Sequence, residues 1–215
     1  MRIKLNFQIF IFLIIFYFTN QIEIYVSLLV LALLHELAHI VTGIVLGLKP
    51  RTLQITPFGF SVYFEEYKRD GKKILTRQKN IITLAGPLFN LLLAIIAICV
   101  NFDYIFTISR ETFIYANILL SAFNLLPIYP LDGGRIVKNI IGNKENISQT
   151  RKITLPEQIS YVTLIALTAV SSILILYVQN IAILFIILCL WIMMIREIKY
   201  NKLRLRVCKI LQKEE

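Results

Sequence analysis

Long apolar runs separated by short polar segments dominate this chain of 215 residues. A helix hydrogen-bonds its backbone internally, so apolar runs of this length predict helices that cross a membrane. A span needs about 20 apolar residues, and the first, fourth and sixth runs are shorter. The predicted fold class is an all-α polytopic membrane protein with about six transmembrane helices, namely Leu5–Thr19, Tyr25–Leu48, Ile81–Val100, Phe113–Leu126, Leu155–Tyr177 and Ile181–Ile195.

The segment Thr52–Tyr67, between the second and third runs, has a different pattern. It is rich in β-forming residues and is interrupted by Pro57, Phe58 and Gly59. Two extended stretches around such a turn predict a small β-hairpin. One interpretation is a strand edge that pairs with an extended peptide. The alternative is a surface loop.

Composition and charge agree with a membrane protein. Hydrophobic residues make up 57% of the chain and charged residues 17%, against about 45–50% and about 25% in soluble domains. A net charge of +10 alone would suggest nucleic-acid binding. With six spans, however, 22 of the 23 lysines and arginines fall on one side of the membrane, and Arg110 is the exception. The positive-inside rule then predicts that both termini are cytoplasmic, and it explains the charge without nucleic acid.

The second run contains three ionisable residues, His35, Glu36 and His39, in an HExxH pattern. Ionisable groups within a span cost free energy and therefore indicate function. Residues i and i+4 share one face of a helix, so both imidazoles can bind one metal ion, for which neutral imidazole favours zinc. Glu36 is then placed to take a proton from a water on the metal. HExxH also occurs by chance, as two hydrogen-bonded histidines beside a surface glutamate.

A catalytic zinc usually has three protein ligands, so two histidines are too few. Asp132 is the candidate third ligand, because it ends the run Asn124–Asp132, in which two prolines break the helix before a pair of glycines. This allows the carboxylate to turn inward. The alternative is that Asp132 caps a turn at the membrane surface.

Together, the motif HELAH and the later motif NLLPIYPLDGGR resemble the site-2 protease family of intramembrane zinc metalloproteases, peptidase M50. The resemblance covers roughly residues 25–200. It implies one Zn²⁺ per chain bound by His35, His39 and Asp132, with Glu36 as the general base. It also implies that Asn124 positions the substrate backbone or stabilises the oxyanion, and that the hairpin around Pro57, Phe58 and Gly59 engages an extended substrate.

The stretches TPFG, FEE and LAGP in the middle of the chain resemble the sporulation branch of that family, the stage IV sporulation protein FB type. In that branch the substrate is a sigma-factor precursor, and a nucleotide-sensing CBS domain commonly follows the core. Here a metalloprotease core over residues 1–200 and a short basic cytoplasmic tail over 201–215 are expected, without a CBS domain. The expected setting is a multi-pass cell-membrane protein. The expected partners are a membrane-associated protein substrate, the lipid bilayer and membrane inhibitor proteins, but no nucleic acid.

Two other functions are compatible with the same residues. A membrane metal-binding or transport protein would use the metal ligands without hydrolysis and would not need Glu36 as a base. A proteolytically inactive relative would act as a binding partner, but the intact HExxH and LDG motifs argue against it.

Overall fold

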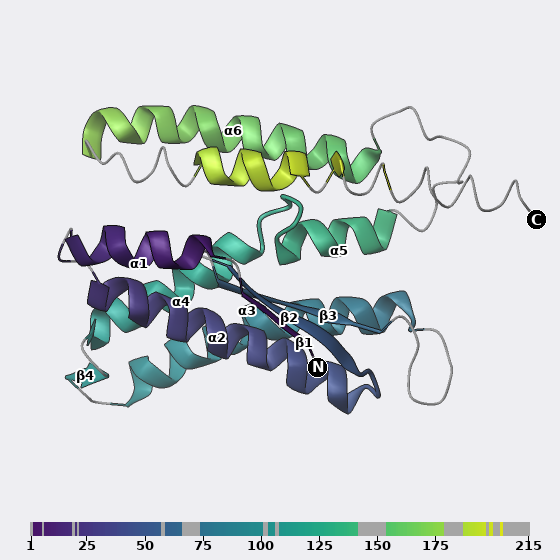
Figure 1. The fold of residues 1–215 in the computed structure, drawn as a ribbon, viewed down its shortest axis with the longest axis horizontal. Helices are drawn as coiled ribbons and strands as arrows, with labels where there is room; N and C mark the ends of the chain where they lie inside the picture. The colour runs from purple at the N-terminus through teal and green to yellow at the C-terminus, as the bar shows by residue number, and fades with distance from the viewer. Residues whose placement is uncertain are drawn as a thin grey trace, which may run out of the picture. The chain divides into compact units, whose positions relative to one another are not determined.

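The structure, a computed structural model, divides into two compact units, Met1–Asn124 and Leu125–Glu215. Figure 1 labels most of the helices and strands of both units. The described residues are 2–5, 7–18, 20, 22–56, 59–65, 74–100, 103–105, 108–141, 154–178, 187–196, 198–199 and 203. All of the predicted tail except residue 203 lies outside them.

The described residues of the first unit form four helices and two small sheets. In chain order its elements are β1 (Arg2–Leu5), α1 (Gln8–Phe18), α2 (Ile22–Val45), β2 (Pro50–Thr56), β3 (Gly59–Phe64), α3 (Thr76–Cys99), β4 (Tyr104–Ile105), β5 (Ile108–Ser109) and α4 (Arg110–Asn124). The second unit contains α5 (Asp132–Ile141), α6 (Leu155–Val178) and a short apolar helix, Ile187–Arg196.

Among the described residues, two helices are long and apolar enough to cross a membrane, namely Tyr25–Val45 within α2 and Thr76–Cys99, which is α3. These correspond to the second and third predicted spans. Helices α1 and α4 have 11 and 15 residues, which correspond to about 17 and 23 Å against a hydrocarbon core of about 30 Å. The number of six spans therefore stays a prediction, and residues 181–186 of the sixth lie outside the described part.

The hairpin prediction is confirmed. Strands β2 and β3 pair antiparallel, from Thr56 opposite Gly59 to Leu53 opposite Val62 and beyond. Pro57 and Phe58, at the tip of the hairpin, lie outside the described residues. The paired strands show that the segment is not merely a loop, and the pairing of its edge with an extended peptide stays a prediction.

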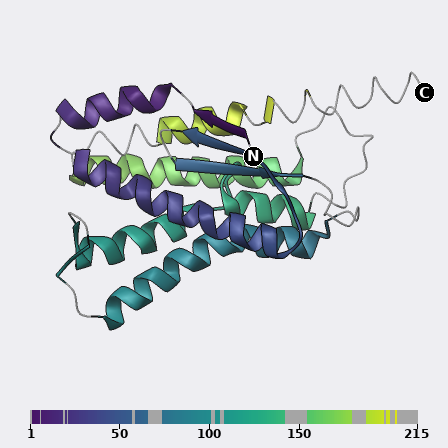
Figure 2. The same ribbon diagram turned by 60° about the horizontal axis from the view of Figure 1, so that its bottom comes forward.

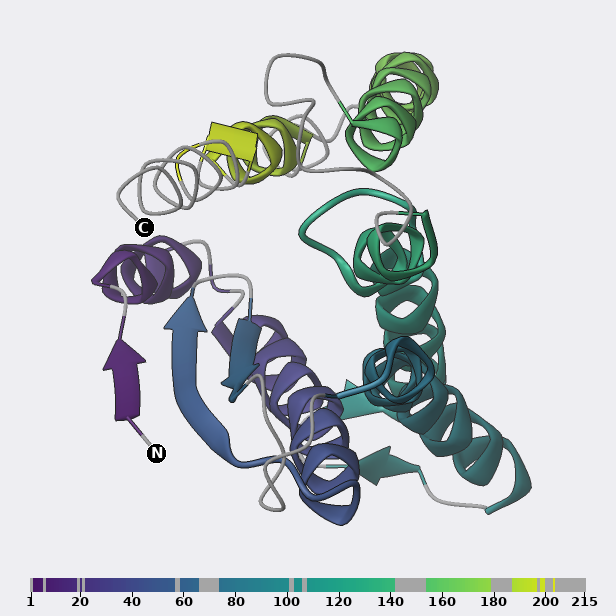
Figure 3. The same ribbon diagram turned by 90° about the vertical axis from the view of Figure 1, so that its right-hand side faces the viewer.

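Three strands were not predicted from the sequence, namely β1 and the short antiparallel pair β4 and β5. Residues Arg2–Leu5, the last of which was assigned to the first span, form β1 and pair in parallel with β2 (Figure 3). As a result, α1 begins only at Gln8. The partner of β1 lies about fifty residues further along the chain, so no local pattern marks the pairing.

Helices α2, α3 and α4 form the core of the first unit (Figure 2). Leu31, Ala97, Ile108 and Phe113 are buried together in a cluster. Small buried residues such as Gly86 and Ala97 allow the helices to approach closely. Pro87 lies inside α3 without ending it, and its carbonyl accepts a hydrogen bond from Ser121 Oγ at 3.0 Å.

Arg110 is the one basic residue on the opposite side in the six-span arrangement, and it is engaged by the fold. Its Nε donates to the carbonyl of Ala97 at 2.7 Å and its Nη2 donates to the carbonyl of Ile98 at 2.6 Å. The last carbonyls of a helix lack partners within the helix, and a cation there also interacts favourably with the helix dipole. Arg110 thus closes the end of α3 at the start of α4.

Candidate metal centre

The three ionisable residues of the HExxH motif are buried on one helix, α2. His35, Glu36 and His39 are 5%, 6% and 4% exposed. Groups of this kind are rarely buried unless they have polar partners or a metal ion. The partners of each side chain therefore decide what the motif can do.

The two imidazoles converge. Their Nε2 atoms are 3.2 Å apart and their rings are nearly perpendicular, at 85°. Two nitrogens bound at about 2.0–2.1 Å to one tetrahedral zinc are separated by about 3.3 Å. The spacing therefore fits two ligands of a single zinc ion. It is also the distance of an ordinary hydrogen bond between the rings.

The orientation of His39 is set by α3. Its Nδ1 donates to the carbonyl of Ile82 at 2.7 Å, and a carbonyl can only accept. In the neutral ring the proton is therefore on Nδ1, which leaves the lone pair of Nε2 directed at the centre. Metal-binding histidines are typically oriented by such an outer partner.

Gly86 makes room for both rings. A Cβ atom at this position would come within 2.6 Å of His35 Nε2 and closer still to His39 Nε2. Only glycine allows α3 to pass this close to the two nitrogens. No role at the metal centre is predicted for Gly86 from the sequence.

Glu36 is held by the hairpin. Its Oε1 accepts a hydrogen bond from the main-chain N–H of Val62 on β3. Glu65 N donates to the carbonyl of Lys49 at 3.1 Å, toward the β2 side. Because N–H directions alternate along a strand, Val62 N–H points away from β2. The carboxylate of Glu36 therefore lies at the outer edge of β3.

Asp132 belongs to the second unit, where it is buried as the first residue of α5. The backbone of the preceding loop packs tightly against the helix start, since a Cβ at Gly133 would meet the carbonyls of Leu125 and Leu126. Arg135 Nη1 lies 3.9 Å from Asp132 Oδ1. The two glycines thus permit the tight turn that was expected to direct this carboxylate inward.

Of the four predicted substrate-binding residues, the structure describes Asn124 and Gly59. Asn124 is the last residue of α4, and its Nδ2 donates to the carbonyl of Leu120 at 2.9 Å. An amide nitrogen has two hydrogens, so one donor remains for another partner. Gly59 is the first residue of β3, where it pairs with Thr56. Pro57 and Phe58 lie outside the described residues, so their role stays a prediction.

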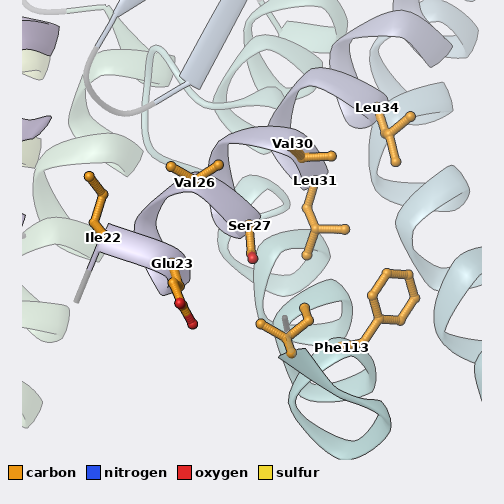
Figure 4. Close-up of a pocket in the computed structure, with 9 residues that line it drawn as sticks. Ile22, Glu23, Val26, Ser27, Val30, Leu31, Leu34 and Phe113 are labelled. Atoms are coloured by element: carbon orange, nitrogen blue, oxygen red, sulfur yellow. The ribbon is translucent and has the colours of Figure 1, made fainter. Parts of the chain in front are cut away.

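A cavity of about 310 Å³ lies elsewhere in the first unit (Figure 4). It is lined by the first half of α2 together with Ile108 and Phe113, and its walls are mostly apolar. The residues of the HExxH motif are not among its lining residues. The cavity is therefore separate from the pair of histidines.

Comparison with known proteins gives consistent matches. The model of the family described as Peptidase family M50 matches residues 23–109 and 103–167. Zinc metalloprotease MJ0392 of Methanocaldococcus jannaschii is 28% identical over 134 residues, which are 60% of this chain and 38% of that protein. Stage IV sporulation protein FB of Bacillus subtilis is 26% identical over 148 residues, 68% of this chain and 50% of that protein. The chain thus spans half or less of the length of these relatives.

A solved structure, a site-2 protease from Methanocaldococcus jannaschii, is similar to this chain with a TM-score of 0.67 at 23% identity. The match covers 91% of this chain and 89% of the other. At this identity the likeness shows a shared fold.

We expect Gly86→Ala to weaken zinc binding by more than about 100-fold, because even the loss of an outer partner of a ligand costs about 10–100-fold and the methyl group would lie where both Nε2 atoms converge. Metal content and a competition titration with a zinc chelator would measure it. Gly43→Ala is the matched control on α2, since the atoms nearest to its methyl would belong to the side-chain ring of Phe64 and not to a histidine. Equal zinc affinity in both variants would contradict the assigned centre.

Proposed function

The chain belongs to peptidase family M50, the site-2 protease family of membrane zinc metalloproteases, and on this premise we propose that it is a zinc-dependent endopeptidase. It cleaves a membrane-associated protein within or near the bilayer. The observation that carries the proposal is the pair of Nε2 atoms 3.2 Å apart on a helix that is long and apolar enough to cross a membrane. The third member of the motif, Glu36, adjoins them in sequence and is buried.

The proposed ligands are His35, His39 and Asp132, with one zinc per chain. They supply two imidazoles and a carboxylate, a donor set found in catalytic zinc sites that keep a fourth position open for water. Asp132 is buried, and a buried carboxylate needs a cation to offset its desolvation. Arg135 Nη1, 3.9 Å from Asp132 Oδ1, is one such cation, and a bound zinc ion would be a second.

Zinc at this site would lower the pKa of a coordinated water toward about 7 and polarise the scissile carbonyl. Glu36 accepts the proton of the attacking water and later donates it to the leaving amine nitrogen. The Val62 N–H supports this role, because it restrains one carboxylate oxygen of Glu36 and so orients the carboxylate. Asn124, with a second amide hydrogen, is the proposed donor to the substrate backbone or oxyanion.

The substrate is proposed to bind as an extended strand along the outer edge of β3. A substrate helix must unwind before its peptide bond can be cut, and its freed backbone groups need partners inside a membrane. Val62 N–H points away from β2 and is bonded to Glu36. A strand added at this edge would bring its carbonyls beside the base.

The wider setting is also a proposal. The protein is a multi-pass cell-membrane protein with cytoplasmic termini, and its partners are the bilayer, its protein substrate and membrane inhibitor proteins, without nucleic acid. A sporulation sigma-factor precursor is the first substrate to test. The similarity to stage IV sporulation protein FB supports that choice.

Asp132→Asn should lower zinc affinity by more than about 100-fold, because it removes a charged ligand rather than an outer partner. Equilibrium dialysis of the purified chain against buffered zinc would measure this. Glu36→Gln is the control, since a general base is not a ligand and its loss should leave zinc binding unchanged. Unaltered zinc affinity in Asp132→Asn would mean that another residue provides the third ligand.

Co-expression with a sigma-factor precursor should give cleavage by the wild-type chain and a loss of about 10²–10⁴-fold in Glu36→Gln, the usual contribution of an acid–base group. Immunoblots of precursor and product would measure it. Cleavage by both chains would refute Glu36 as the base. Cleavage by neither chain would refute this substrate. Single-span membrane proteins would then be tested as substrates. A chain that binds zinc but cleaves none of them would favour the metal-binding or transport function.

Val62→Pro should lower the rate of cleavage by about 10–100-fold, the equivalent of one hydrogen bond to a charged group. Proline removes the N–H that contacts Glu36, and it is tolerated on an edge strand where that N–H points outward. Val62→Ala keeps the N–H and should cleave normally. Equal rates for the proline and alanine variants would remove Val62 N–H from the mechanism.

A further inference from the structure

Two asparagines lie fully buried in the first unit and take no part in the proposed reaction. Asn90 on α3 and Asn117 on α4 are each 0% exposed. Asn117 Nδ2 donates to the carbonyl of Phe113 at 2.9 Å. For Asn117 Oδ1, and for both polar atoms of the Asn90 side chain, no described residue offers a hydrogen-bond partner.

The two amides lie at the same level of neighbouring helices. Helices α3 and α4 run in opposite directions, because Arg110 at the start of α4 binds carbonyls at the end of α3. Their register is set by the hydrogen bond from Ser121 Oγ to the carbonyl of Pro87. Asn90 is about one turn beyond Pro87 and Asn117 about one turn before Ser121, so both side chains lie one turn away from that bond, on the same side of it.

Unpartnered amides are costly in such a place. A buried polar group without a partner loses its hydrogen bonds to water and forms no hydrogen bond within the protein to offset that loss. Helix α3 is long and apolar enough to cross a membrane, where bulk water cannot supply the missing bonds. The site needs a small ligand that both donates and accepts hydrogen bonds.

We infer that Asn90 and Asn117 form a buried water-binding site between α3 and α4. Buried waters typically make two to four hydrogen bonds to polar groups that otherwise lack partners. One water can accept from Asn90 Nδ2 and donate to Asn117 Oδ1, and Asn90 Oδ1 can accept from the same or a second water. Neither amide carries a charge, so the site has no ligand that would favour a metal ion.

A direct bond between the two amides is the competing arrangement. It would satisfy a donor and an acceptor without water, but no hydrogen bond joins these atoms in the structure. The water therefore links two helices of which one, α3, also carries Gly86 and Ile82 beside the histidines. The inference itself rests on the helix pair and does not depend on the proposed protease activity.

The test is a double-mutant cycle on the full chain, using Asn90→Ala, Asn117→Ala and the double variant. Unfolding in mixed micelles by titration with SDS would give the equilibrium constants. Each single change leaves the other asparagine and the water with one hydrogen-bond partner fewer, so each should destabilise the fold. The double change should cost less than the product of the two single effects, with a coupling of at least about twofold in the equilibrium constant.

Thr83→Ala combined with Asn117→Ala is the matched control. The Thr83 hydroxyl already donates to the carbonyl of Lys79 at 2.9 Å, and it lies about 10 Å along α3 from Asn90, so these two changes should be additive. Asn90→Ser keeps a hydroxyl able to bond the same water and serves if Asn90→Ala does not fold. The Asn90→Ser variant should be less destabilised than Asn90→Ala.

A crystal structure of the zinc-loaded chain at a resolution that shows ordered waters completes the test. Coupling together with an ordered water between the two amides is the expected result. Coupling without a water would mean a direct amide pair and would overturn the site, as would strictly additive effects. None of these readouts involves cleavage, so failure here is distinguishable from failure of the proposed function.

Discussion

The close approach of α3 to α2 at Gly86 is the constraint on which the candidate metal centre depends. The side-chain hydrogen of Gly86 is all that separates the α3 backbone from the two imidazoles. One turn before it on α3, the carbonyl of Ile82 binds His39 and sets which nitrogen keeps the proton. If the helices lay further apart, His39 would lose that partner, and the two Nε2 atoms would no longer be held at the spacing that fits a tetrahedral ion.

Burying ionisable groups in an apolar helix has a cost that the protein offsets with main-chain groups. His39 is partnered by a carbonyl of α3, and Glu36 by an N–H of β3. Main-chain partners are fixed by the backbone and do not need to be ordered as free side chains would. The helix that carries the motif is therefore surrounded by rigid neighbours on two sides, which suits a site whose geometry must be held ready for reaction.

The hairpin has two roles that meet at Val62. One edge of β3 pairs with β2, and β1 pairs with the far side of β2, so the sheet joins the start of the chain to the middle of the first unit's sequence. The other edge carries the N–H bound to Glu36. In the proposed function the same edge receives substrate, which would place the scissile segment beside Glu36 of α2 at the edge of β3. Membership of peptidase family M50 indicates the chemistry of this arrangement, and the contacts described above give its geometry.

Local patterns in the sequence determined the features that depend on neighbouring residues. The HExxH spacing places His35 and His39 on one helical face, since a helix brings residues four apart together. The apolar runs predicted α2 and α3, and the turn at Pro57–Gly59 predicted the hairpin. Tertiary structure decided the rest, including the pairing of β1 with β2, the room at Gly86, and the placement of Asn90 and Asn117 at one level of neighbouring helices. The partners of His39 and Glu36 lie 43 and 26 residues away, and they are main-chain atoms that every residue possesses. No residue type marks such atoms in a sequence, so only the packing of the helices and the hairpin could select them.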